Sequence, residues 1–173
     1  MRVEGRAWTF DEDVNTDAIY PQSAYRLAAD EAARSLFGSL RPGWAQAVLA
    51  GDVIVAGANF GMGSARPAPV LLRRLGIAAC VADSIATLFL RNCVNAGLPV
   101  LAAPGVRAIV AEGDRVSIDL ACGAIENRTS GARIEARPLP EPLRAIIADG
   151  GLLAALERKG YIMAEPGEQA AAR

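Results

Sequence analysis

The residues with the clearest chemical potential lie in one short loop, residues 59–67 (NFGMGSARP). Gly61 and Gly63 can adopt positive φ and let backbone N–H groups approach a ligand closely. Arg66 adds a guanidinium group, which suits bidentate binding of a carboxylate. A helix expected from residue 67 would present unpaired N–H donors to the same anion. The loop therefore predicts an anion site of carboxylate size.

Each of these features also has a purely structural interpretation. The glycines could only shape a tight turn, Ser64 could only cap a helix, and Arg66 could be a solvated residue at a helix start. A nucleotide-binding P-loop is disfavoured, because the GxxxxGK[ST] pattern is missing.

Residue types outside the loop restrict the chemistry further. The chain contains no histidine, which excludes His-based triads and His-ligated zinc. Proton transfer must use a carboxylate, Lys, Tyr, Cys or an activated hydroxyl. Cys80, Cys93 and Cys122 form no CxxC pair, and we interpret them as buried packing residues. The acidic run 11–13 has no companion ligands, so we predict a solvated run and no metal site on this chain.

The hydrophobic pattern around the loop predicts an α/β fold. Residues 52–58 (DVIVAGA) are apolar and β-branched, as in a buried strand, and Pro67 and Gly76 bracket the helix that follows. The resulting β–loop–α–β–α–β order favours a parallel sheet. Apolar and polar residues alternate from residue 116, which indicates an added antiparallel section.

The remaining elements are expected as follows: strands over 77–82 and 98–102, and helices over 28–36, 67–75, 84–95, 143–148 and 152–159. Residues 1–28 are interpreted as irregular. We expect one domain over 1–163 and a disordered tail over 164–173.

Composition sets the broad class of the protein. The chain has 173 residues, 52% of them hydrophobic and 21% charged, which fits one globular domain. A net charge of −1 without a basic block argues against nucleic acid as a partner. No uninterrupted apolar stretch is long enough for a membrane span, and the N-terminus lacks the apolar core of a signal peptide. We expect a cytoplasmic protein.

Three motifs together resemble the swivelling domain of the aconitase superfamily. These are residues 51–77 (GDVIVAGANFGMGSARPAPVLLRRLGI), residues 82–101 (ADSIATLFLRNCVNAGLPVL) and the early element 13–21 (DVNTDAIYP). The resemblance covers roughly residues 8–160 and is nearest to the small subunits of 3-isopropylmalate dehydratases. It implies a single β/β/α swivelling domain.

The resemblance also implies roles for individual residues. Ser64 matches the serine that takes the Cα proton of the substrate, and Arg66 matches an arginine that grips a carboxylate. Gly63 precedes that serine, and Asp17 matches an active-site carboxylate. The 4Fe–4S cluster of such enzymes is held by a large subunit or domain. The resemblance therefore implies that this chain supplies no cluster ligand and that its partner is a cluster-bearing large subunit.

The chain departs from the family pattern inside the loop. Members usually read Cys-Gly-Ser-Ser-Arg-Glu-His, whereas this chain has MGSARPA at 62–68. The second serine, the glutamate and the histidine are missing. The departure leaves two alternatives, a divergent hydro-lyase with another substrate or a chain whose activity has decayed.

The leading hypothesis is a small subunit of a hydro-lyase that acts on a small hydroxy di- or tricarboxylate. Isopropylmalate is the first substrate choice, with maleate or citraconate as rivals. Tyr25 and Arg26 are expected to contact the γ-substituent of the substrate. The competing hypothesis is a non-catalytic carboxylate-binding or interaction domain that keeps the fold.

Overall fold

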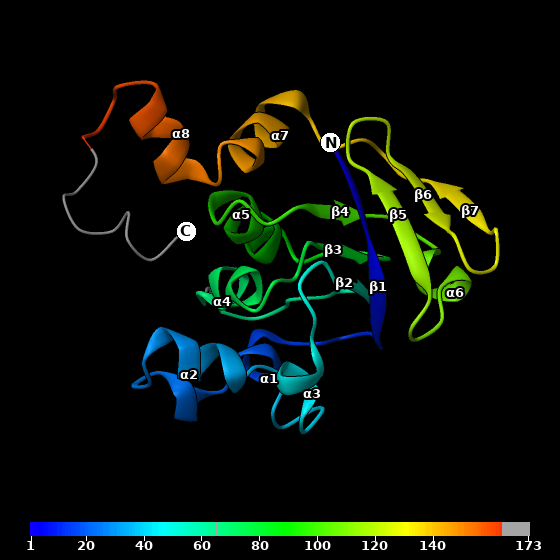
Figure 1. The fold of residues 1–173 in the computed structure, drawn as a ribbon, viewed down its shortest axis with the longest axis horizontal. Coiled ribbons are helices and arrows are strands. Elements are labelled where there is room, and N and C mark those ends of the chain that lie inside the picture. Colours follow the sequence, from blue (N-terminus) through cyan, green and yellow to red (C-terminus); the bar gives the residue numbers. More distant parts are fainter. Residues whose placement is uncertain (65, 164–173) are drawn as a thin grey trace.

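Seven strands form one mixed sheet in the order β4-β3-β2-β1-β5-β6-β7 (Figure 1). The computed structural model describes residues 1–64 and 66–163. The strands are β1 (Arg2–Phe10), β2 (Val53–Ala56), β3 (Ala79–Ala82), β4 (Val100–Ala102), β5 (Arg115–Asp119), β6 (Ala124–Asn127) and β7 (Arg133–Glu135).

One half of the sheet is parallel, as predicted. β1 pairs with β2, β2 with β3, and β3 with β4, all in parallel. Every residue of β2 and β3 is buried, which explains why both strands are continuously apolar. The other half is the predicted antiparallel section, in which β5 pairs with β1 and β6, and β6 with β7. The α/β fold class is confirmed.

The helices are short, and most of them pack against one another beside the parallel strands (Figure 1). α2 contacts α4, α4 contacts α5, and α5 contacts both α7 and α8. The helical segments are α1 (Thr16–Ile19), η1 (Gln22–Ala24), α2 (Ala29–Arg34), α3 (Trp44–Ala47), α4 (Ala68–Arg74), α5 (Thr87–Asn95), α6 (Val106–Ile109), α7 (Glu141–Ala148) and α8 (Leu152–Arg158). All five predicted helices are confirmed, with shifted ends.

The N-terminal segment corrects the prediction. Residues 1–28 were expected to be irregular, but Arg2–Phe10 forms β1, the strand that joins the two halves of the sheet. Arg2, Glu4 and Arg6 alternate with inward-facing residues, so the strand has the period of two expected for a sheet. The charged residues and Gly5 hide this period in the sequence.

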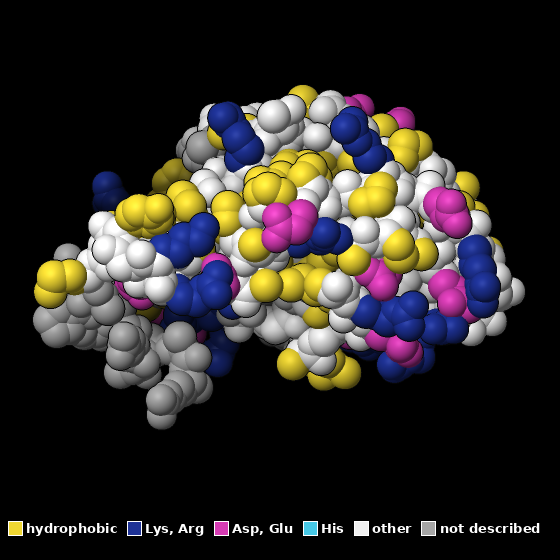
Figure 2. All heavy atoms as spheres, turned by 90° about the horizontal axis from the view of Figure 1, so that it is seen from above, with side chains coloured by type: hydrophobic (Ala, Val, Ile, Leu, Met, Phe, Trp, Pro, Cys, Tyr) yellow, Lys and Arg dark blue, Asp and Glu magenta, His cyan; other side chains and the backbone are white. Residues whose placement is uncertain are grey.

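The ends and the surface add two observations. The predicted tail, 164–173, lies outside the described residues. Across 1–64 and 66–163, none of the helices has the length and apolar character needed to cross a membrane. On the face toward α7 and α8, basic and acidic side chains are interspersed (Figure 2). Ion pairs such as Arg158–Asp149 and Arg133–Glu126 reflect this mixture.

Candidate active site

The structure joins the glycine-rich loop to the early DVNTDAIYP element. The Thr16 N–H donates to the Met62 carbonyl at 2.8 Å, and the Gly61 N–H donates to the Val14 carbonyl at 2.8 Å. The buried Thr16 hydroxyl donates to the Ser64 carbonyl at 3.0 Å. Two of the motifs noted in the sequence therefore form one unit.

The start of the loop is fixed on a second side. Asn59 has a φ of 61°, and its side-chain amide donates to Asp13 Oδ1 at 2.8 Å. The Asn59 N–H donates to Ser84 Oγ at 2.7 Å, and the Phe60 N–H donates to the Ser84 carbonyl at 3.0 Å. The loop is thus hydrogen-bonded both to the segment before α5 and to the early element.

Both loop glycines are required by the local geometry. Gly61 has a φ of 76°, and a Cβ atom there would lie 2.2 Å from the Phe89 ring. Gly63 has a φ of 103°, and its added Cβ would lie 3.1 Å from Thr16 Oγ1. The structural interpretation of the glycines is correct, but the turn they shape also carries Ser64.

Ser64 is exposed and does not cap a helix. α4 begins at Ala68 with Pro67 as its N-cap, and no side chain caps it. Within the described part of the chain, the N–H groups of Gly63 and Ser64 donate to no backbone oxygen or side chain. The serine hydroxyl and two free donors therefore stand on the same stretch of loop.

The helix after the loop does not contribute as expected. α4 has seven residues, and Pro67 and Pro69 lack an N–H. The Val70 and Leu71 N–H groups already donate to the Pro67 carbonyl. Among the described residues, this leaves only the Ala68 N–H of the first turn without an acceptor, so the helix N-terminus offers an anion fewer donors than predicted.

Arg66, the one charged residue in the loop sequence 59–67, is largely enclosed. Its side chain is 11% exposed, and one Nη2 atom donates to Asp17 Oδ1. The guanidinium carbon lies 4.8 Å from the centre of the Tyr25 ring, within cation–π range. Its Nε atom is buried and has no hydrogen-bond partner among the described residues. Arg66 is therefore not the solvated residue of the alternative interpretation.

A pocket of about 260 Å³ opens beside this arginine. It is lined by Tyr20, Tyr25, Arg66 and Pro67. The two tyrosine rings lie 5.0 Å apart, and the Tyr20 hydroxyl donates to the Ala24 carbonyl at 3.1 Å. Tyr20 belongs to the early element, but no pattern in the sequence indicates that it would reach this pocket.

The remaining predicted residues divide into two groups. Asp17 meets Arg66, and Tyr25 covers the guanidinium. Ser64 and Gly63 do not line this pocket, and they are joined to it through the loop and through the Thr16–Ser64 hydrogen bond. Arg26 is exposed and lies outside the pocket, and no described residue forms a hydrogen bond or ion pair with it. The structure therefore brings Asp17, Tyr25 and Arg66 into contact, places Ser64 and Gly63 on the same loop, and leaves Arg26 apart.

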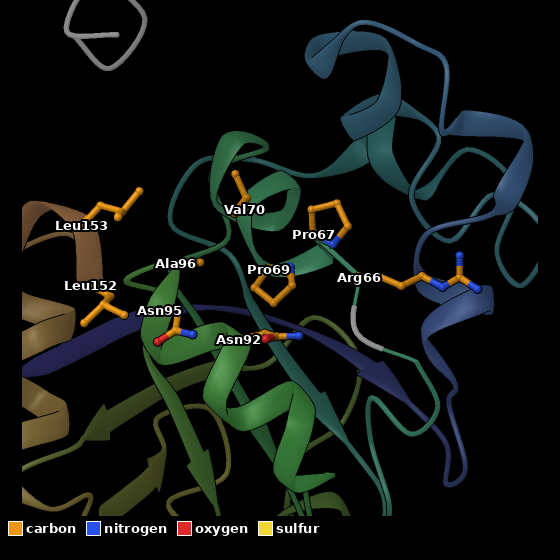
Figure 3. Close-up of a pocket in the computed structure, with 9 residues that line it drawn as sticks. All are labelled: Arg66, Pro67, Pro69, Val70, Asn92, Asn95, Ala96, Leu152 and Leu153. Atoms are coloured by element: carbon orange, nitrogen blue, oxygen red, sulfur yellow. The ribbon is translucent and has the colours of Figure 1, made fainter. Parts of the chain in front are cut away.

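A larger groove of about 460 Å³ runs from the same loop between α4, α5 and α8 (Figure 3). Its walls are mainly apolar, and Asn92 and Asn95 of α5 project into it. Figure 3 shows the Arg66 side chain pointing away from this groove, toward the N-terminal segment that carries Asp17. Arg66 therefore lines both cavities, but its guanidinium points toward Asp17 and away from the apolar groove.

The cysteines do not form a metal centre. Burial raises the pKa of the Cys80 and Cys93 thiols, so both remain protonated and inert. Cys122 is exposed after β5, so its expected burial is wrong. In 1–64 and 66–163, no three His, Cys, Asp or Glu side chains are grouped so that they could hold a metal ion. The residues present therefore do not fit an iron–sulfur cluster.

Comparison with known proteins identifies the family of the chain. A family model described as Aconitase C-terminal domain matches residues 41–112. The 3-isopropylmalate dehydratase small subunit 2 of Archaeoglobus fulgidus is 40% identical over 165 residues, which cover 94% of this chain and 99% of the relative. The methanogen homoaconitase small subunit of Methanothermobacter thermautotrophicus is 42% identical and covers 87% of this chain and 88% of the relative.

A solved structure extends the similarity to the fold. The crystal structure of 3-isopropylmalate dehydratase from Methanocaldococcus jannaschii superposes with a TM-score of 0.86 at 36% identity. The match covers 93% of this chain and 96% of the other. Because relatives at about 40% identity cover nearly the whole length, this chain belongs to the aconitase C-terminal domain family that contains the small subunits of 3-isopropylmalate dehydratases.

Proposed function

We propose that this chain is the small subunit of an aconitase-type hydro-lyase, with Ser64 as the base and 3-isopropylmalate as the substrate. The observation that carries the proposal is the position of Ser64. Its hydroxyl is exposed and does not cap a helix, and it lies two residues from an enclosed arginine. The loop that carries it is hydrogen-bonded to the Thr16–Asp17 segment. Relatives from Archaeoglobus fulgidus, Methanosarcina mazei and Methanosarcina acetivorans, at 40–42% identity, bear this enzyme's name.

A serine hydroxyl is normally too weak a base to remove a proton from carbon, so it must act as a stabilised alkoxide. Three groups of this chain support that state. The N–H groups of Gly63 and Ser64, which have no acceptor among the described residues, can donate to an anion, and Arg66 adds a positive charge two positions along the loop. Arg66 would also bind a substrate carboxylate, while Gly63 lets the backbone approach closely.

Substrate selection is assigned to the pocket beside the arginine. Tyr25 contacts the guanidinium and lines the pocket with Tyr20, so it would meet the γ-substituent of a bound substrate. Arg26 follows Tyr25 and is exposed, so it would reach the substrate only by turning its side chain toward the pocket. The apolar tyrosine faces favour an alkyl γ-substituent such as isopropyl over a third carboxylate.

The proposal requires a partner. Ser64 is exposed and no described residue covers it, whereas alkoxide chemistry needs a site from which water is excluded. We assign this cover, together with the 4Fe–4S cluster that would supply a Lewis acid for the departing hydroxyl, to a large subunit. The complex is expected in the cytoplasm.

A second substrate class has one observation in its favour. A relative at 42% identity is named a homoaconitase small subunit, so hydroxy tricarboxylates belong in the test with maleate and citraconate. A non-catalytic carboxylate-binding domain is the contrasting proposal, and the missing second serine at Ala65 supports it.

The test is turnover by the reconstituted complex. The chain is co-expressed with a cluster-bearing large subunit from its own genome, reconstituted without oxygen and assayed on a panel of hydroxy acids. Ser64→Ala should lower kcat by about 10²–10⁴-fold, because it removes the base. Ser39→Ala, at an exposed turn residue, is the control and should keep full turnover. Unchanged turnover in Ser64→Ala would reject the base, and absent turnover with every partner would support the binding domain.

A further inference from the structure

The guanidinium group of Arg66 already binds a carboxylate, and this carboxylate comes from the chain itself. Arg66 Nη2 donates to Asp17 Oδ1. The two side chains differ in exposure, because Arg66 is 11% exposed and Asp17 is 57% exposed. The aspartate therefore lies on the solvent side of the pair, while the arginine lines the small pocket.

This pairing leaves Arg66 incompletely satisfied. Asp17 contacts only Nη2, while the buried Nε has no acceptor among the described residues. A buried donor without an acceptor is unfavourable, and the usual bidentate carboxylate pairing of arginine satisfies two N–H groups at once. A carboxylate that spans Nε and Nη2 would therefore bind Arg66 better than Asp17 does.

We infer that Asp17 competes with the substrate carboxylate for Arg66, and that it holds the arginine until that carboxylate takes its place. The inference rests on the proposed function, which gives Arg66 a carboxylate to bind. It adds a specific role for Asp17, which is to neutralise an enclosed cation and to set the affinity that a substrate must exceed.

The local structure allows such an exchange with little movement. Asn15 caps α1 by accepting a hydrogen bond from the Ala18 N–H at 2.7 Å, which fixes the backbone on both sides of Asp17. Only the aspartate side chain needs to rotate into solvent. An ion pair with one partner more than half exposed is weak, so a better-placed carboxylate can displace it.

A positioning role for Asp17 predicts the opposite result. If Asp17 only oriented Arg66, its loss would loosen the arginine and weaken carboxylate binding. If Asp17 competes, its loss removes the competitor and strengthens binding. The sign of the change in affinity therefore distinguishes the two roles.

The experiment titrates malonate, a simple dicarboxylate, into the ¹⁵N-labelled chain and follows the Arg66 Nε–H signal by NMR. Asp17→Asn keeps the shape of the side chain and should bind malonate about two- to five-fold more tightly than the wild type. Arg66→Lys removes the Arg66 Nε–H signal, so that variant is followed through the Gly63 backbone N–H signal, and it should show no binding at this site. Asp30→Asn is the matched control, because Asp30 is an exposed partner of Arg74 elsewhere on the surface, and it should leave the affinity unchanged.

Equal or weaker binding by Asp17→Asn would overturn the inference, as would the absence of any Arg66 shift in both proteins. The readout needs neither a large subunit nor turnover. A complex that turns over with unchanged malonate affinity in Asp17→Asn would keep the proposed function and reject this inference. Tighter malonate binding in a chain that never supports turnover would do the reverse.

Discussion

Ser64 depends on one buried residue of another segment for its position. Thr16 is 3% exposed, and its hydroxyl donates to the Ser64 carbonyl while its N–H donates to the Met62 carbonyl. These contacts grip the loop on both sides of Gly63. A serine that must present its hydroxyl to a carbon atom needs such a fixed backbone, because small displacements are costly in catalysis.

Thr16→Val is therefore expected to impair the site without breaking the fold. The methyl group fills the space of the hydroxyl but leaves the Ser64 carbonyl unpaired, which costs about 1 kcal/mol. In the reconstituted complex, kcat should fall about 10- to 100-fold. Thr16→Ser restores the donor and should recover turnover, whereas full activity in Thr16→Val would show that the loop holds Ser64 by other means.

Asp52 is a buried residue that joins two strands of the sheet, much as Thr16 joins two segments at the loop. It is 4% exposed and accepts hydrogen bonds from Arg6 Nη2 at 2.6 Å, Trp8 Nε1 at 2.7 Å and the Leu49 N–H at 2.9 Å. Burial opposes its ionisation, but the hydrogen bonds from Arg6, Leu49 and Trp8 outweigh burial and hold the pKa of Asp52 below its usual value. Asp52 thus fastens β1 to the start of β2.

This lowered pKa predicts a loss of stability in acid. As the pH falls below about 4, the unfolded chain takes up the proton of Asp52 more readily than the folded chain, so the stabilisation present above that pH is lost. In Asp52→Asn, the free energy of unfolding at pH 7 should be about 2 kcal/mol lower than in the wild type. On acidification, this free energy should fall less in the variant than in the wild type. Urea unfolding at pH 7 and at pH 3 measures both effects. Asp11→Asn, at a 94% exposed residue, is the control and should behave like the wild type.

At the scale of elements, the loop after β2 is coupled to α5 through Gly61 and Phe89. The Phe89 ring is buried, stacks edge-on against Phe60 at 5.3 Å and occupies the place of a Gly61 side chain. The loop can therefore lie flat on α5 only when residue 61 is glycine.

Gly61→Ala should consequently destabilise the protein more than its backbone angle alone requires. Gly43→Ala is the matched control, because Gly43 has a similar φ of 83° but open space around its Cβ position. We expect Gly61→Ala to cost about 1–3 kcal/mol more than Gly43→Ala, the usual range for overpacking a core. Comparison of urea midpoints for the two variants gives this difference, and equal midpoints would show that Phe89 moves aside freely.

The elements also show what the sequence could and could not predict. β2 and β3 are buried on both faces, so their apolar runs marked them clearly, and Pro67 and Gly76 marked α4. β1 was not predicted, because its outer face carries Arg2, Glu4 and Arg6 and because Gly5 stands where a bulky inward-facing residue would be expected. At Gly5 an added Cβ would lie 2.0 Å from the Gly51 carbonyl oxygen, so tertiary contact and not strand propensity selects the residue.

The site was predictable to the extent that its residues are local in sequence. The loop glycines, Ser64 and Arg66 lie within six positions, and the Thr-Asp element was a second recognisable motif. Their meeting through Thr16, and the entry of Tyr20 into the pocket, depend on contacts between segments more than 40 residues apart. The N-terminus of α4 offers an anion fewer N–H donors than predicted, because Pro67 and Pro69 have no N–H.

For the whole molecule, the arrangement of pockets indicates where a large subunit would lie. The small pocket and the groove between α4, α5 and α8 share Arg66 and Pro67 at their edges. A body that covers Ser64 would therefore also lie against the mouth of the groove. The exposed side chains of Val70 and Leu153 on its rim would then be buried, which favours association.

Leu153→Glu should weaken the complex with the large subunit by about tenfold, because it places a charge where the partner buries an apolar surface. The residue is 64% exposed on α8, so the free chain should keep its fold and unfolding midpoint. Leu49→Glu is the matched control, because Leu49 is 62% exposed and lies outside the groove, and it should leave the affinity unchanged. Titration calorimetry with the purified large subunit gives the three dissociation constants. Equal affinities would place the partner on another face and leave the groove outside the interface.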